Sequence, residues 1–389
     1  MGALRPTRAD ELASIIGDAT SRGGRLELRG GGSKADVGAP VRDVAVIDMT
    51  GFAGVIDYDP PELVLTVGAG TPLAEIAALV ASEQQMLAFD PFDHGLVFGR
   101  PRGAATIGGV IAAGVSGSRR LSAGAVRDHL LGFTGVSGRG ERFVAGAKVV
   151  KNVTGFDLSK LMCGSWGRLV ALTEVTLKVL PRPRETVTRV LLGQTPEQAL
   201  KSMTAAMRSQ AGVAAAAHVP GVLRGGEALT LLRLEGFGPS ITARLAMLDG
   251  LAGGICRGET LSDTAIWDDL RTLAPLDDGR PLWRISLPVG GCSLLLAALE
   301  PHGARFLVDW AGGLVWTTFD GAAALVRDAA VAAGGHAMLV RAGAAMRADV
   351  PALHPQPPAL AALEARVRRS FDPAGVFETG RFGRIPDAD

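Results

Sequence analysis

Cysteine is scarce in this sequence, with Cys163, Cys256 and Cys292 the three among 389 residues. They lie far apart and form no Cys-X-X-Cys pair, so their spacing predicts no zinc site, no iron–sulfur cluster and no disulfide framework. Isolated thiols of this kind are usually buried and inert, and we interpret these three as structural.

The six histidines are scattered. No two of them lie at the spacing of a metal-binding pair, and no Gly-X-Ser-X-Gly segment indicates a serine nucleophile. We therefore expect no bound metal. His336, in Gly334-Gly335-His336, is the histidine that we consider for chemistry, with a structural role as the more ordinary interpretation. The six are His94, His129, His218, His302, His336 and His354.

An excess of charge of one sign is also missing. The chain has 40 Lys and Arg against 39 Asp and Glu, a net charge of +1, which argues against the basic surface typical of nucleic-acid binding. The longest apolar run, Cys292 to Leu299, is much shorter than the roughly 20 residues of a membrane span. The N-terminal residues do not resemble a signal peptide. These absences predict a cytoplasmic protein that meets a membrane only through partners.

The length of the chain favours two domains, because one hydrophobic core seldom holds so many residues. The segment Leu180-Pro181-Arg182-Pro183-Arg184 predicts a boundary, since its two prolines end a strand and stiffen a linker. Hydrophobic periodicity predicts an α+β fold, with an antiparallel sheet in the second domain. The predicted helices are 9–21, 73–82, 196–209, 240–252, 267–274, 322–333 and 359–370. The predicted strands are 26–29, 43–48, 55–58, 63–67, 148–150, 172–179, 228–235, 283–288 and 306–310.

Glycine, in contrast, is abundant, and its clusters point to a ligand. Thr106-Ile107-Gly108-Gly109 is followed by Gly114, Gly117 and Gly124. Such density is expected where backbone N–H groups approach a ligand or where the chain turns with positive φ. A second cluster, Gly164 to Gly167, follows polar side chains that either contact the same ligand or serve as local caps. They are Asn152, Thr154, Asp157 and Ser159.

The loop from Arg29 to Lys34 combines three glycines, a serine hydroxyl and two cations in six residues. Consecutive glycine N–H groups and nearby cations suit a pyrophosphate, and a glycine-rich hairpin turn is the alternative. The loop is not a P-loop, because the chain has no Gly-Lys followed by Ser or Thr.

A Rossmann dinucleotide site is a further alternative. Gly68 and Gly70 follow a predicted strand and precede a predicted helix, and Asp90 lies where a ribose-binding acid would be expected. Leu73 stands at the third glycine position and argues against this interpretation.

Taken in order, these segments resemble the vanillyl-alcohol-oxidase-type (PCMH-type) FAD-binding flavoproteins, and in particular the small FAD-binding subunit of bacterial glycolate oxidase. The segments are GGGSK, VGAGTPLAEI, TIGG, KNVTGFDLSKL, GSWGRLVALTEVTLKVLP and FDPAGVFETGR. The resemblance to the subunit rests on Ser118-Arg119-Arg120, Ala125-Val126-Arg127-Asp128, Leu282-Trp283-Arg284-Ile285-Ser286-Leu287-Pro288, Asp309-Trp310-Ala311-Gly312-Gly313 and Ala333-Gly334-Gly335-His336-Ala337.

The resemblance implies an FAD-binding domain of two α+β lobes over 1–182, an α+β cap domain over 183–358, and a C-terminal helix and tail, 359–389, that return to the FAD domain. It implies that the first loop holds the FAD pyrophosphate and that the later glycines line the flavin. The residues that it assigns to FAD are Gly30, Gly31, Gly32, Ser33, Lys34, Thr106, Ile107, Gly108, Ala113, Gly114, Gly117, Gly124, Leu169, Val170 and Ala171. Val170 replaces a glycine that is usual in the family.

The sequence also departs from the family. Members with covalent flavin often carry a histidine in the first loop, which this chain lacks, so FAD is expected to be non-covalent. The catalytic 2-hydroxy-acid dehydrogenases carry a Glu-His-Gly segment, and no Glu-His pair occurs here. The closing Asn-Pro-Gly of the family is replaced by Glu378-Thr379-Gly380, so an asparagine that could reach the flavin is missing and an acid stands nearby.

These matches and departures predict an FAD-binding subunit of a glycolate-oxidase-type complex. A larger FAD-containing subunit would carry out the substrate chemistry, an iron–sulfur subunit would accept electrons, and the flavin of this chain would relay electrons or support assembly. The alternative is a self-sufficient FAD-dependent D-2-hydroxy-acid dehydrogenase with His336 as base and Arg284 holding the carboxylate. A structural subunit whose flavin site has decayed is a third interpretation.

Overall fold

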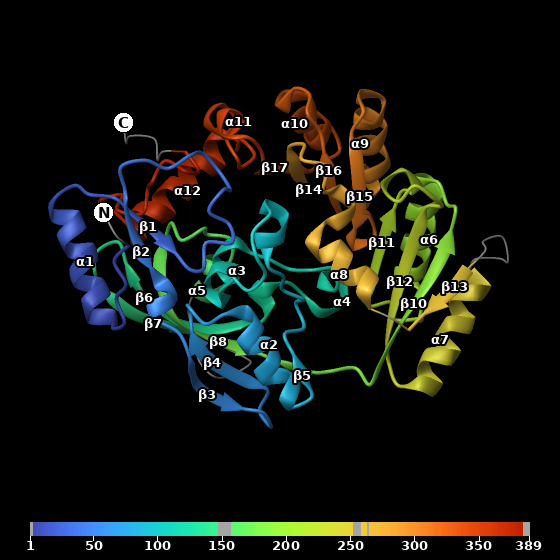
Figure 1. The fold of residues 1–389 in the computed structure, drawn as a ribbon, viewed down its shortest axis with the longest axis horizontal. Helices are drawn as coiled ribbons and strands as arrows, with labels where there is room; N and C mark the ends of the chain where they lie inside the picture. The colour runs from blue at the N-terminus through green and yellow to red at the C-terminus, as the bar shows by residue number, and fades with distance from the viewer. Residues whose placement is uncertain (1–2, 147–156, 252–257, 263, 384–389) are drawn as a thin grey trace. The chain divides into compact units, whose positions relative to one another are not determined.

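The computed structural model describes residues 3–146, 157–251, 258–262 and 264–383. The described chain divides into two compact units (Figure 1). Unit 1 contains residues 1–116, 124–182 and 355–389, and unit 2 contains residues 117–123 and 183–354. The chain passes from unit 1 to unit 2 after Arg182, within the proline-containing segment 180–184. The segment Gly117–Ala123 lies in unit 2, whereas the glycine-rich stretch around it lies in unit 1. The chain returns to unit 1 at Pro355, and the C-terminal segment was expected to begin at residue 359.

Two groups of strands organise unit 1. Among its described residues, five strands form an antiparallel sheet in the order β3 (Val55–Asp59), β4 (Val64–Gly68), β8 (Val170–Lys178), β6 (Leu130–Ser137) and β7 (Arg142–Gly146). A separate parallel pair joins β1 (Leu26–Arg29) to β2 (Ala45–Asp48), and β5 (Gln85–Met86) pairs with β9 (Leu180–Pro181).

Each group of strands has its own hydrophobic core, which agrees with the two predicted lobes. One core joins the five-stranded sheet to helices α2 (Leu73–Ser82) and α3 (Ile107–Ala113). The other joins the β1–β2 pair to helix α1 (Ala9–Ser21) and to Val376 and Phe377 of the C-terminal tail. The tail therefore completes a core that begins more than 300 residues earlier, since fully buried Leu12 and Ile16 lie in the same cluster. The shorter helix α5 (Leu158–Met162) and the long α12 (Pro358–Phe371) also belong to this unit.

Unit 2 is built on one antiparallel sheet, as the sequence predicts. Among its described residues the strand order is β13 (Gly258–Leu261), β10 (Glu185–Leu192), β12 (Leu229–Gly236), β11 (Ala215–Val219), β15 (Arg305–Asp309), β16 (Leu314–Thr318), β14 (Leu282–Ser286) and β17 (His336–Arg341). The helices of the unit are α4 (Arg120–Ala123), α6 (Pro196–Arg208), α7 (Gly238–Leu251), α8 (Ala265–Thr272), α9 (Cys292–Leu299), α10 (Ala323–Ala332) and α11 (Ala344–Asp349).

The strand pairing of unit 1 excludes the Rossmann alternative. Strand β4, which leads into Gly68 and Gly70, pairs antiparallel with both β3 and β8, whereas a Rossmann site needs parallel strands joined by a crossover helix. Both glycines instead allow close packing against the segment from Met49 to Ala53, because a Cβ at either position would overlap a carbonyl oxygen there.

The described cysteines are consistent with structural thiols. Cys292 is buried and Cys163 is half-buried, and neither forms a disulfide. Burial raises the pKa of each thiol to about 12, so neither is a thiolate at neutral pH. Cys256 lies outside the described residues, as do Asn152, Thr154 and the strand predicted over 148–150.

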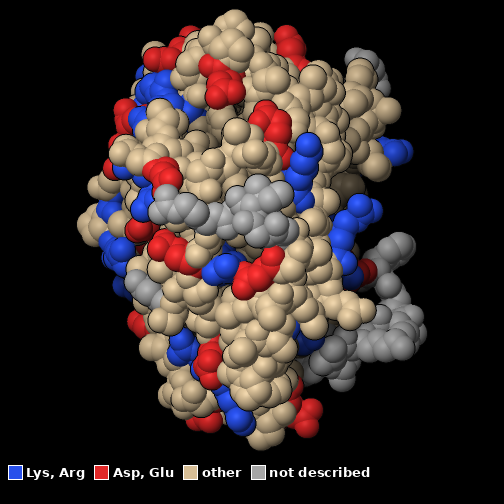
Figure 2. Space-filling view, turned by 90° about the vertical axis from the view of Figure 1, so that its right-hand side faces the viewer, with Lys and Arg blue, Asp and Glu red and all other residues tan. Residues whose placement is uncertain are grey.

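The surface repeats the balance of charge seen in the composition. On the face drawn in Figure 2, basic and acidic side chains are interspersed among uncharged ones, without a broad area of one sign. Within the described ranges, no helix is both long enough and apolar enough to cross a bilayer. The described histidine, cysteine and acidic side chains form no group that could hold a metal ion.

Candidate functional site

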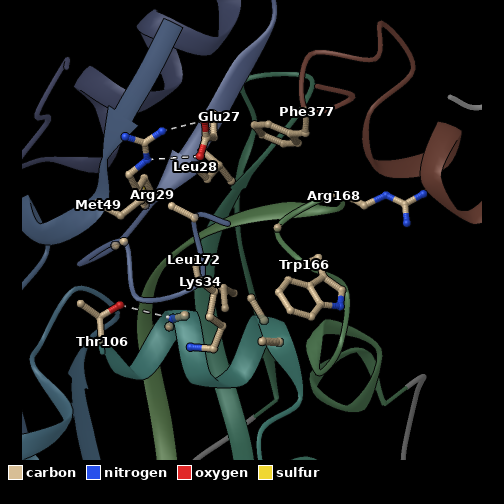
Figure 3. Close-up of a pocket in the computed structure, with 18 of the residues that line it drawn as sticks. Glu27, Leu28, Arg29, Lys34, Met49, Thr106, Trp166, Arg168, Leu172 and Phe377 are labelled. Carbon is tan, nitrogen blue, oxygen red and sulfur yellow. Dashed lines mark hydrogen bonds and ion pairs between the residues drawn. The ribbon is translucent and has the colours of Figure 1, made fainter. Parts of the chain in front are cut away.

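A large cavity opens in unit 1, where the end of β1, helix α3 and the C-terminal tail come together (Figure 3). Counted out to its open mouth, it has a volume of about 1030 Å³. Four stretches supply its walls: 26–35, 106–113, 166–172 and 377–382.

The first wall is the glycine-rich loop from Gly30 to Lys34. A Cβ on Gly30 would overlap the Thr106 hydroxyl, and one on Gly31 would overlap the Ala104 carbonyl, so the loop passes too close to its neighbours for any side chain. Gly32 has a φ of 75°, in the left-handed region that favours glycine. Within the described ranges, no protein acceptor meets the backbone N–H groups of these five residues. Successive free N–H groups of this kind form an anion-binding nest.

Lys34 adds a positive charge to the nest. Its ammonium lies 3.3 Å from the Ser33 hydroxyl, and no carboxylate of the described chain approaches it within ion-pair distance. Burial lowers the pKa of Lys34 to about 8, while the more distant charge of Asp93 raises it. At neutral pH the lysine is protonated, partly desolvated and unpaired by protein. An anionic ligand in the cavity would stabilise the charged Lys34 ammonium by pairing with it.

The second wall is helix α3, which presents only small residues to the cavity. Gly108, Gly109, Ala112 and Ala113 line it, whereas Ile107 on the opposite side is fully buried in the core. The Thr106 hydroxyl caps the helix by accepting from the Gly109 N–H at 3.4 Å. This face is flat and without charged side chains, which suits a planar ring system.

Helix α3 itself rests directly on the end of β4. A Cβ on Gly108 would lie 2.8 Å from the Ala69 carbonyl oxygen. The glycine therefore brings the helix against the strand, and the cavity gains depth from that close contact.

The third wall is formed by the residues that follow α5 and by the C-terminal tail. The Trp166 ring lies 4.9 Å from the Phe382 ring, and both line the cavity. Arg381 of the tail pairs with Glu27 of β1 at 2.6 Å, and Arg29 pairs with the same carboxylate at 2.9 Å. The ion pair between Arg381 and Glu27 therefore fixes the C-terminal tail against β1 at the edge of the cavity.

Glu378, the acid that replaces the family's asparagine, faces away from the cavity. Its carboxylate accepts from Arg368 at 2.8 Å and lies 3.8 Å from Arg168, and all three side chains are buried. Glu364 approaches both arginines, at 3.2 Å from Arg168 and 3.5 Å from Arg368. Figure 3 shows the Arg168 side chain directed away from the other labelled residues. The four charges hold the tail against α12, and Glu378 does not line the cavity.

The structure brings together most of the predicted cofactor-binding residues. Gly30, Gly31, Gly32, Ser33, Lys34, Thr106, Gly108, Ala113 and Val170 line the cavity, and Ile107, Gly114, Gly117, Gly124, Leu169 and Ala171 do not. Ile107, Leu169 and Ala171 are buried in the hydrophobic cores. Gly114 and Gly124 adopt positive φ, Gly114 as the C-cap of α3. Gly117 belongs to unit 2, where its carbonyl accepts from the Trp310 indole at 3.0 Å.

Of the polar residues before Gly164, two are described and neither lines the cavity. Asp157 caps α5 by accepting from the Lys160 N–H at 3.2 Å, and the Ser159 hydroxyl lies 3.5 Å from the Leu131 carbonyl oxygen. Sequence reasoning missed other lining residues, among them Met49, Trp166, Phe377, Arg381 and Phe382. Trp166 lies within the second glycine cluster, and Phe377 and Arg381 lie within the closing segment FDPAGVFETGR, but Met49 and Phe382 carry no local signal.

The two candidates for chemistry lie in unit 2. Arg284 is on β14 and His336 begins β17, and the two strands pair with Ser286 opposite His336. His336 is exposed. Its pKa lies below the usual range, mainly because of partial burial and then because of the positive charge of Arg284, so it is neutral at pH 7.

Comparison with known proteins gives this cavity a chemical context. The family described as FAD binding domain matches residues 2–146. The chain is 34% identical to glycolate oxidase subunit GlcE of Escherichia coli (strain K12) over 376 residues, which covers 96% of this chain and 95% of the relative. It is 28% identical to a D-lactate dehydrogenase of Archaeoglobus fulgidus over 207 residues, 53% of this chain and 44% of that protein.

Among solved structures, alkyldihydroxyacetonephosphate synthase is similar with a TM-score of 0.69 at 15% identity. The similarity covers 96% of this chain and 75% of that one. At this identity the likeness shows a shared fold.

Proposed function

This chain belongs to the family of PCMH-type FAD-binding oxidoreductases, and from that premise we propose that it is the FAD-binding subunit of a glycolate-oxidase-type complex, which oxidises glycolate to glyoxylate. The observation that carries the proposal is the similarity, from end to end, to a protein named as a subunit of that oxidase. FAD is the cofactor of the family. When bound, it accepts the electrons that leave a 2-hydroxy acid on oxidation to the 2-oxo acid.

The cavity fits FAD by the chemistry of its walls. The free N–H groups of Gly30–Lys34 and the Lys34 ammonium would hold the diphosphate. The small-residue face of α3 would lie against a flat ring, and Trp166 and Phe382 would shield it from water. No histidine, cysteine or tyrosine belongs to the described lining, which supports non-covalent binding.

In the complex, a larger FAD-containing subunit would remove the hydride from glycolate and an iron–sulfur subunit would take the electrons. The flavin of this chain would then relay electrons or stabilise the assembly. The sequence lacks the Glu-His pair of the family's catalytic 2-hydroxy-acid dehydrogenases, which favours this division of labour. Association with a membrane through these partners belongs to the same proposal.

A second candidate is a self-sufficient FAD-dependent D-2-hydroxy-acid dehydrogenase. The observation in its favour is His336, which is exposed, neutral at pH 7 and close enough to Arg284 to sense its charge. A neutral imidazole can accept the proton of a substrate hydroxyl.

Anaerobic addition of glycolate to the purified chain separates the two candidates. The relay subunit keeps an oxidised flavin spectrum with glycolate or D-lactate, and loses it only when the larger subunit is added. Bleaching of the chain alone would contradict the relay function and support the dehydrogenase. A chain that never takes up FAD would support a decayed site instead.

The affinity for FAD is expected to depend on pH through Lys34. Lys34 is protonated in the free protein below its pKa of about 8, and the diphosphate of FAD favours the protonated form in the complex. Affinity should therefore be constant below about pH 8 and fall by up to about tenfold for each pH unit above it, because binding must then take up a proton. A fluorescence titration of the apoprotein with FAD measures this dependence.

The matched variants are Lys34→Met and Lys160→Met. Lys34→Met should bind FAD more weakly at neutral pH and lose the dependence above pH 8. Lys160 forms an exposed ion pair with Asp157 on α5, so its replacement should leave the profile of the parent. An unchanged slope in Lys34→Met would show that another group takes up the proton.

A further inference from the structure

Residues 379–383 of the C-terminal tail join two walls of the cavity in unit 1, and we call them the strap. The inner side of the strap lines the cavity, whereas Gly380 and Gly383 are exposed to solvent on its outer side. The residues of the inner side are Thr379, Arg381 and Phe382. A segment with one side toward a cavity and the other toward water can cover a bound ligand.

The strap begins at a buried anchor. The Glu378 carboxylate accepts from Arg368 at 2.8 Å, and the Glu378 carbonyl accepts from the Arg25 guanidinium. Val376 and Phe377, which precede this residue, are buried in the core of α1 and the β1–β2 pair. In contrast, every residue of the strap is half-buried or exposed. Segments with few buried contacts open at a lower free-energy cost than the core to which they are attached.

Arg381 attaches the strap to the glycine-rich loop and its continuation. Its guanidinium donates to the Glu27 carboxylate at 2.6 Å and to the Lys34 carbonyl at 3.4 Å. Its own carbonyl accepts from the Ala39 N–H at 2.9 Å. A Cβ on Gly38 would lie 2.6 Å from that carbonyl oxygen, so the strap lies directly on this part of the chain. These contacts join protein to protein, and they are therefore present without a ligand.

Phe382 attaches the strap to the opposite wall. Its ring lies 4.9 Å from the Trp166 ring at an interplanar angle of 43°. The guanidinium carbon of Arg168 lies 6.0 Å from the same phenyl ring. Aromatic and cation–π contacts of partly exposed side chains stabilise a structure only modestly. The structure therefore shows the strap closed, held by contacts that can break while the hydrophobic core stays intact.

Glycines flank the two residues that make these attachments. Gly380 has a φ of 82° and Gly383 a φ of 90°, and a Cβ at either position would meet no atom within 4 Å. The backbone conformation, and not a close neighbour, is thus what favours glycine at both positions. The few residues that absorb changes of φ and ψ when a lid moves are often small ones. The two glycines are placed to act as such hinges.

We propose that the strap is a gate for FAD, which enters and leaves the cavity when the contacts of Arg381 and Phe382 are broken. The inference rests on the proposed FAD site and explains how that site retains its cofactor without a covalent bond. Because the Arg381 contacts join protein to protein, they close the gate in both the empty and the loaded chain. Loosening them should raise the open fraction of both states by the same factor. Association and dissociation should then become faster together, while the Kd for FAD stays the same.

Two rate measurements on the purified chain test the gate. Stopped-flow mixing of the apoprotein with FAD gives the association rate, and a chase of labelled FAD with excess unlabelled FAD gives the dissociation rate. Arg381→Gln should raise both rate constants by about tenfold and leave Kd within about twofold of the parent value, since it removes a charge-assisted contact. The variant should fold, because Arg29 remains paired with buried Glu27 at 2.9 Å. Arg22→Gln removes an exposed ion pair with Asp18 on α1 and should keep the rates of the parent.

Three results would overturn the gate. A faster dissociation with weaker binding and an unchanged association rate would mean that Arg381 contacts FAD itself. Unchanged rate constants would mean that the strap is a fixed wall, and a chain that takes up no FAD would mean that the cavity has another ligand. If Arg381→Gln does not fold, Gly380→Ala decides: alanine disfavours this φ, so it too should raise both rate constants.

The gate and the proposed function can fail separately. The rate measurements need neither glycolate nor a partner subunit, so bleaching of the chain by glycolate would overturn the relay function and leave the gate intact. Normal FAD binding with unchanged rates in Arg381→Gln would overturn the gate and leave the subunit function intact.

Discussion

Gly31→Ala is expected to abolish FAD binding at ordinary concentrations. The new methyl group would overlap the Ala104 carbonyl, which belongs to the segment entering α3, so the loop from Gly30 to Lys34 would have to move away. Two or more N–H contacts to the diphosphate would be lost, each worth roughly 1.5–3 kcal/mol because the acceptor is charged. The affinity should fall by about a hundredfold or more. Titration of the apoprotein with FAD measures the loss.

Gly17→Ala is the matched control for this variant. Gly17 lies in α1, also in unit 1, and a Cβ there meets no atom within 4 Å. Alanine in a helix interior is more favourable than glycine by roughly 1 kcal/mol, so this variant should be slightly more stable and should bind FAD normally. Normal FAD binding by Gly31→Ala would mean that the loop is not the diphosphate site.

Glu378→Ala is expected to destabilise unit 1 by about 3–5 kcal/mol, which is the usual cost of removing one partner from a buried ion pair. The replacement leaves the guanidinium of Arg368 without its 2.8 Å partner and deprives buried Arg168 of a nearby carboxylate. Glu364 is half-exposed and compensates only in part. Urea unfolding followed by circular dichroism measures the free energy of unfolding.

The comparison for this variant is an exposed ion pair. Asp18 lies 4.0 Å from Arg22 on α1 with both side chains largely in solvent, so Asp18→Ala should change the free energy of unfolding by less than about 1 kcal/mol. Because Glu378 holds the tail that carries Arg381 and Phe382, FAD should also dissociate more readily from Glu378→Ala. Equal effects of the two replacements would show that the buried charges contribute little.

Much of the fold could be predicted because its elements carry a local pattern. The helices of 9–21 and 73–82 and the strand of 26–29 have the bounds expected from their apolar spacing. Strand β6, which the sequence did not predict, contains Gly132 and Gly135, and glycine weakens a strand signal. Its burial depends on pairing with β8, which is distant in sequence.

Helix α3 was missed for a related reason. Gly108 and Gly109 lower its intrinsic helix propensity, and the helix forms because it packs against Ala69 at the end of β4. The same glycines therefore weakened the helix signal and indicated a ligand site.

The rest of the site depends on contacts that no local pattern records. Arg381 reaches Glu27 across most of the chain, and Trp166 meets Phe382 in the tail. The short segment Gly117–Ala123 looks like a continuation of the glycine-rich stretch, yet it lies in unit 2, where Arg120 lies 4.3 Å from the Trp310 ring. Only the folded chain brings these residues together.

The most direct test of the account is the absorption spectrum of the purified chain, recorded as isolated, after incubation with FAD, and after acid precipitation. The account predicts the visible spectrum of an oxidised flavin, one FAD for each chain, and release of all the flavin into the supernatant on precipitation. A chain that takes up no FAD would contradict the assignment of the cavity, and flavin that stays with the precipitated protein would contradict non-covalent binding.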